Sequence, residues 1–125
     1  MAVVLPFVQP AIVRLRIDHV RNTSTTRAAL TPAMVLRTAS VTIETRNVEA
    51  IDAILRAVRS TAIAPEMRPV DLRYAMRFED RRGNVRQSVC IDAFGTRGEL
   101  DGQAVRFASD AIKRAIVAAF PALVY

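Results

Sequence analysis

The stretch 71-DLRYAMRFEDRRGNVRQSVCIDAF-94 decides the fold, because its side chains alternate in character on both sides of a short loop. In residues 71–79 one side of an extended chain carries the apolar set Leu72, Tyr74, Met76 and Phe78. The alternation resumes in residues 85–94, whose apolar side carries Val85, Val89 and Ile91. A period of two is typical of a half-buried strand. Two such runs joined by residues 80–84, in which Gly83 can adopt a positive φ angle, predict a β-hairpin.

Upstream of this hairpin, the pattern predicts two more strands. Residues 12–20 alternate, with Val13, Leu15, Ile17 and His19 on one face and Arg14, Arg16 and Asp18 on the other. Residues 21–26 are short and polar, which is typical of a loop. Residues 27–34 allow either a turn or a short helix that has Pro32 at its first position. The β-branched content of residues 35–44 predicts the second strand.

Capping residues and apolar periodicity predict two helices. Asn47 is a strong N-cap, and the residues after it form one apolar stripe at helical spacing: Val48, Ile51, Ile54, Leu55 and Val58. Two prolines in residues 61–69 end this helix. A second helix is expected from the N-cap Ser109 to the stop at Pro121. Between the hairpin and this helix, the glycines in residues 95–98 end the preceding strand. Asp101-Gly102 then predicts a tight turn, and residues 104–107 predict a short strand.

These elements predict an α+β fold in one domain, residues 1–125. We expect a mainly antiparallel sheet of four to five strands, with two amphipathic helices on one face, in the order β-β-α-β-β-β-α. Residues 1–10 form an apolar N-terminal extension, which either packs on the domain's own core or contacts another subunit.

Charge is the most unusual feature of the composition. The net charge is +6, and Lys113 is the single lysine among eighteen basic residues. Arginine offers a planar fork of donors for carboxylates and phosphates, but codon usage in a GC-rich bacterial genome also favours it over lysine. No apolar run approaches the roughly 20 residues of a membrane span. The compartment stays open between the cytoplasm and export with a leader absent from this sequence.

The sequence predicts no catalytic residues, no metal site and no cofactor, so a non-enzymatic role is favoured. His19, the only histidine, lies on the apolar face of its strand, and its neighbour Asp18 points the other way. Cys90, the only cysteine, falls on the face opposite to His19. Nearby arginines could lower the pKa of its thiol there, but a free cysteine more commonly packs as a small apolar residue, and that interpretation is favoured. The glycines form no phosphate-binding motif.

Arginines on the polar face of the sheet and on the hairpin tip are the candidate binding surface: Arg14, Arg16, Arg73, Arg77, Arg81, Arg82 and Arg86. Such a surface suits an anionic partner, but it is equally consistent with a solvated sheet face on which the arginines pair with aspartate and glutamate across strands. The leading hypothesis is a binding or accessory domain that recognises a protein, another anionic partner or a second copy in a homodimer, through this face or an exposed strand edge. One alternative is a small-molecule pocket protein or minor enzyme, whose site between sheet and helices would be a closed cavity lined by Tyr74 and Met76. Nucleic-acid binding is a weaker one, because no aromatic side chains alternate with the arginines.

Overall fold

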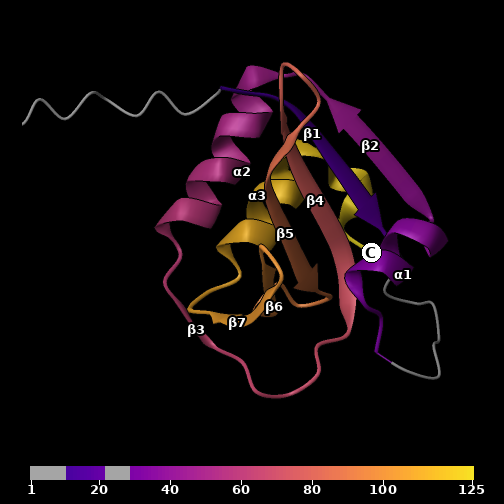
Figure 1. The fold of residues 1–125 in the computed structure, drawn as a ribbon, viewed down its shortest axis with the longest axis vertical. Helices are drawn as coiled ribbons and strands as arrows, with labels where there is room; N and C mark the ends of the chain where they lie inside the picture. The colour runs from indigo at the N-terminus through magenta and orange to yellow at the C-terminus, as the bar shows by residue number, and fades with distance from the viewer. Residues whose placement is uncertain (1–10, 22–28) are drawn as a thin grey trace, which may run out of the picture.

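The computed structural model describes residues 11–21 and 29–125. Figure 1 shows the chain as one sheet with helices on both of its faces. The described elements are β1 (Ile12–His19), α1 (Pro32–Thr38), β2 (Val41–Thr45), α2 (Val48–Ser60), β3 (Ile63–Pro65), β4 (Leu72–Asp80), β5 (Val85–Asp92), β6 (Arg97–Leu100), β7 (Gln103–Phe107), α3 (Ala111–Ala119) and the 3₁₀ turn η1 (Pro121–Leu123). The N-terminal extension, residues 1–10, lies outside the described residues, as does most of the loop predicted at residues 21–26.

The α+β class and the antiparallel sheet are confirmed, although the sheet is larger than expected. Its seven strands follow the order β2-β1-β4-β5-β6-β7-β3, and every neighbouring pair is antiparallel. The predicted hairpin is the β4–β5 pair at the centre, and Gly83 in its loop has a φ of 83°. Asp101 and Gly102 both have positive φ angles in the predicted tight turn between β6 and β7.

The main core lies between one face of the sheet and the two longer helices, α2 and α3. Asn47 caps α2 as expected, because its side chain accepts a hydrogen bond from the Ala50 amide. The helices bury their apolar stripes against the inner side chains of β1, β4 and β5, which include Ile17, Tyr74 and Met76. The Tyr74 hydroxyl is satisfied inside this core by donating to the carbonyl oxygen of Leu123. Two of the described helices therefore pack on one face of the sheet, and the expected total of two helices is too low.

A third helix, α1, covers part of the opposite face, and this corrects the strand predicted over residues 35–44. The Thr31 side chain caps the Met34 amide, and Pro32 occupies the first turn, so residues 32–38 form a helix and the strand begins only at Val41. Val35 is fully buried in a second, smaller core. The other buried members of this core are Val20, Leu30, Leu72, Ala75 and Cys90.

Two register shifts in the β4–β5 hairpin move residues off the faces predicted for them. The shift between Leu72 and Tyr74 places Leu72 in the second core rather than beside Tyr74. The shift between Phe78 and Glu79 leaves Val85 paired with Glu79 and 47% exposed, not on the apolar side. Each extra residue in a strand reverses the direction of the side chains beyond it.

Two strands form where the sequence indicated only loops. Residues 63–65, in the segment predicted to end the first helix, form β3 against β7. Residues 97–100 form β6 between β5 and β7, although the sequence predicted that residues 95–98 would end a strand. The buried carboxylate of Glu66 connects this region, because it accepts hydrogen bonds from the Arg68 amide and from the Arg97 side chain. Hydrogen bonding to the Arg68 amide and to Arg97 lowers the pKa of Glu66 to about 2.

Candidate binding surface

Three of the predicted arginines lie together on the face of the sheet opposite α2 and α3. Arg16 on β1 is directly across from Arg77 on β4, and Arg14 is across from Glu79. All three form ion pairs: Arg14 with Glu79, Arg16 with Glu44 and Asp18, and Arg77 with Asp18. The central carboxylate of Asp18 is almost completely buried and also accepts a hydrogen bond from Thr42. This part of the face is therefore close to neutral.

Arg73 does not belong to this surface, and its expected exposure is wrong. It is only 6% exposed, because the α1 region covers the lower end of β4. Its guanidinium donates to the Asp71 carboxylate and to the carbonyl oxygen of Arg21. A buried guanidinium that is held in this way supports the loop packing around it rather than contacting a partner.

The tip of the β4–β5 hairpin is built around the side chain of Asp80. One carboxylate oxygen accepts from the amides of Arg82 and Asn84, and the other accepts from Nε of Arg86 at 2.7 Å. Burial alone would raise the pKa of Asp80, but the hydrogen bonds from Arg86, Asn84 and Arg82 together lower it. Because both oxygens are used inside the hairpin, Asp80 balances Arg86 and holds the tip in shape.

Arg81 and Arg82 project from this tip and are both exposed. Within the described part of the chain, neither side chain has an ion-pair partner. With Arg86 and Asp80 they line an open surface cavity of about 520 Å³, whose remaining wall is formed by Ala11 and Val13 at the start of β1. Three guanidinium groups and one carboxylate thus line a cavity with an apolar wall, and only the Arg86 guanidinium is paired with that carboxylate. The structure brings these three predicted residues together around one cavity, and among them Arg81 and Arg82 differ from Arg14, Arg16 and Arg77 in having no ion-pair partner among the described residues.

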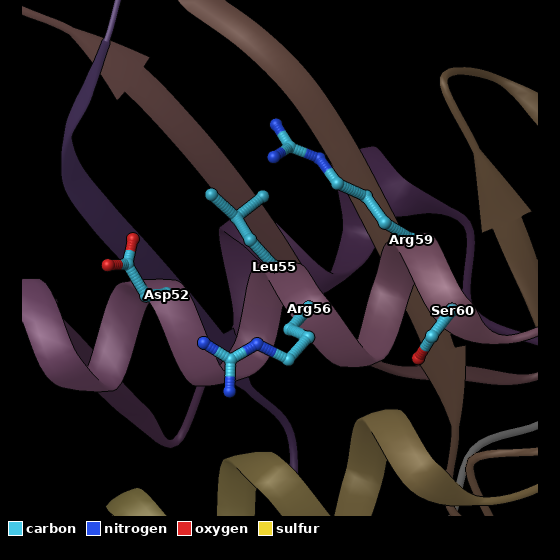
Figure 2. A pocket seen from close by; sticks show the side chains of 5 residues that line it. All are labelled: Asp52, Leu55, Arg56, Arg59 and Ser60. Atoms are coloured by element: carbon cyan, nitrogen blue, oxygen red, sulfur yellow. The ribbon is translucent and has the colours of Figure 1, made fainter.

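A second, shallower cavity of about 360 Å³ lies on α2, and sequence analysis did not single it out. Figure 2 shows its lining side chains along one helix: Asp52, Leu55, Arg56, Arg59 and Ser60. Their spacing of three and four residues could have indicated a shared helix face. Neither of these two cavities is lined by Tyr74 or Met76, which are fully buried in the main core.

His19 is enclosed in the protein rather than presented to a substrate. Its ring stacks on Tyr74 with 4.0 Å between ring centroids, and Nδ1 lies 3.0 Å from the carbonyl oxygen of Arg73. Burial lowers the pKa of His19, and the positive charges of Lys113 and Arg73 lower it further, against the opposite effect of main-chain hydrogen bonds. Asp18 is on the other face and bonds to Thr42, so it does not orient the imidazole.

Cys90 is also buried, and it packs as the small apolar residue that the sequence favoured, not as a thiol activated by arginines. It packs in the second core with Val35 and Ala75. Burial, with a smaller contribution from the charge of Glu99, raises the pKa of the Cys90 thiol to about 12. The thiolate is therefore strongly disfavoured at neutral pH. Among the described residues no group of three or more histidine, cysteine or acidic side chains is placed to hold a metal ion.

In comparisons with known proteins, no family model, no curated protein and no solved structure matches this chain. None of the helices in the described residues is both long enough and apolar enough to cross a membrane.

Proposed function

We propose that this protein is a non-enzymatic binding domain whose hairpin tip recognises an acidic segment of another protein. The observation that carries the proposal is the contrast between the arginines at the tip and those on the strands. Arg14, Arg16 and Arg77 already have carboxylate partners, whereas Arg81 and Arg82 are exposed beside an open cavity. Exposed guanidinium groups next to an apolar wall suit a carboxylate side chain that is carried by a peptide.

The main alternatives predict different behaviour. A single-stranded nucleic acid would be expected to stack on aromatic side chains, but Tyr74 and Phe78 are fully buried on the other face of β4. A small-molecule pocket between sheet and helices would need space beside Tyr74 and Met76, where the main core is packed. The acidic peptide therefore agrees best with the geometry of the tip.

The test is fluorescence anisotropy with a labelled glutamate- and aspartate-rich peptide at low and at physiological salt. We expect weak binding that falls as salt is added, because exposed charges are screened. The double variant Arg81→Glu/Arg82→Glu should lose this binding. The matched control is Arg56→Glu/Arg59→Glu, which makes the same charge change on α2 at the cavity of Figure 2 and should retain it.

Three results would contradict the proposal. Equal losses in the two double variants would show a response to net charge alone, and a loss in the α2 variant only would move the site to the second cavity. An oligonucleotide of equal charge that binds more tightly than the peptide would favour the nucleic-acid alternative.

A further inference from the structure

The two edges of the sheet differ in the main-chain groups that they present. Main-chain hydrogen bonds at the strand ends define which residues point outward, because consecutive residues of a strand direct their main-chain groups to opposite sides. The Ser40 amide donates to the carbonyl oxygen of His19, and the Val20 amide donates to that of Arg73. The main-chain amide and carbonyl groups of His19 therefore point toward β2. Those of its partner Val41 point toward β1.

It follows that Val41, Ile43 and Thr45 use their main-chain groups within the sheet. Thr42 and Glu44 direct theirs away from β1, toward the open edge. In the described part of the chain, no element pairs with this edge, because β2 is the last strand of the sheet and α1 packs on β1 and β4. The β2 edge thus presents two amide donors and two carbonyl acceptors.

The opposite edge, β3, is protected. The Glu66 amide donates to the carbonyl oxygen of Ala104, and the Ala108 amide donates to that of Ala62, so Ile63 and Pro65 point outward. Proline has no amide hydrogen, so this edge offers a single outward donor. Proline on an edge strand is a common device against pairing with another chain. The β2 edge has no proline, lysine or bulge between Val41 and Thr45.

We propose that the β2 edge is a homodimer interface, in which a second copy pairs antiparallel across a two-fold axis at Ile43. This register places Thr42 of one copy opposite Glu44 of the other, so that the outward donors and acceptors satisfy each other. Glu44 directly faces a threonine. The two Glu44 side chains are diagonal neighbours across the axis, but each is already paired with Arg16 on its own sheet. The half-buried side chains of Ile43 meet on the helix side and extend the main core. The proposal is independent of the function assigned to the hairpin tip.

The first experiment is sedimentation velocity over a wide range of protein concentrations. A five-residue edge is smaller than the interfaces of stable dimers, so we expect a concentration-dependent dimer of micromolar or weaker affinity. In the main chain Thr42→Pro removes only an outward amide hydrogen, and it should weaken association by about tenfold or more, because the two-fold symmetry removes two donors at once. The control Thr42→Val keeps that amide but loses the same hydroxyl contact to Asp18, and should dimerise like the wild type.

The second experiment remains informative if Thr42→Pro fails to fold. In a Cys90→Ala background, Ile43→Cys should form an intermolecular disulfide under mild oxidation, because the two Ile43 positions face each other at a non-hydrogen-bonded pair. Val41→Cys, on the same strand and face, should not. The proposal is overturned by a monomer at all concentrations, by a dimer that Thr42→Pro leaves unchanged, or by equal crosslinking at positions 41 and 43.

Discussion

Single residues in this protein show how the same side-chain type takes different roles according to its neighbours. Arg73 is buried and anchors a loop, Arg77 is paired on the sheet face, and Arg81 is exposed at the hairpin tip. His19 is the clearest case at this scale, because a group that would titrate near neutral pH in water is enclosed against Tyr74.

We expect stability to fall as the pH is lowered from 7 to 5, because the folded state binds a proton at His19 less readily than the unfolded chain does. The pKa of His19 is lowered in the fold, so stability is lost as the pH falls through the unfolded value of about 6.5. The lowered pKa values of Glu66 and Asp80 act differently: their contributions are lost only below about pH 4.5.

Urea unfolding at pH 7 and pH 5 measures this difference. His19→Phe preserves the ring beside Tyr74 but cannot titrate, and His19 is the only histidine in the chain. The variant should therefore show a smaller change in the free energy of unfolding between the two pH values. A variant that loses as much stability as the wild type would show that another group is responsible.

At the scale of elements, helix starts and strand contacts determine where the chain is sensitive to substitution. We predict that Asn47→Ala destabilises the protein by about 1 kcal/mol, because it removes the acceptor that caps the Ala50 amide. Asn47→Asp keeps an acceptor at the start of α2 and should remain close to the wild type. Thermal or urea unfolding checks both, and equal losses in the two variants would contradict a capping role.

Strand β6 is packed too closely to accept a side chain at Gly98. A Cβ atom there would lie 1.9 Å from the main-chain oxygen of Cys90 on the neighbouring strand. Gly98→Ala should therefore cost about 3 kcal/mol or more of unfolding free energy. The comparison is Gly83→Ala at the hairpin tip, where the space is open but φ is positive, and about 1–2 kcal/mol is expected. Similar losses at both positions would show that backbone conformation, not the close contact, dominates.

At the scale of the whole molecule, the sheet separates two cores of unequal size, and the smaller one carries Cys90. We predict that Val35→Ala loosens α1 and raises the labelling rate of Cys90 by a thiol reagent at pH 8. The control Val58→Ala truncates a buried valine of the main core on the other face. Both should cost about 2 kcal/mol, but only Val35→Ala should raise labelling by more than the change in global stability explains. Equal effects would mean that the two cores open together.

Much of this architecture is readable from local pattern, because period-two alternation and capping residues act over a few residues. The central hairpin, the start of β1, the cap at Asn47 and the turn at Asp101-Gly102 all follow from such short-range rules. The arginines of the hairpin tip could be named in the same way, but their binding role stays a proposal. Their grouping around one cavity depends on β1 lying beside β4, which no local signal defines.

Long-range packing decided what local pattern could not. Residues 35–38 have strand-like composition, yet they continue the helix that Thr31 and Pro32 start, and Val35 packs in one cluster with Ala75 and Cys90. The strands β3 and β6 are short and exist because neighbouring strands supply their hydrogen bonds. Arg73 is buried at the end of β4 near α1, not exposed as expected. Leu72 and Val85 lie on other faces than predicted because of register shifts in the β4–β5 pair. Alternation shows that a strand has two faces, but only the contacts made by distant segments determine which of them is covered.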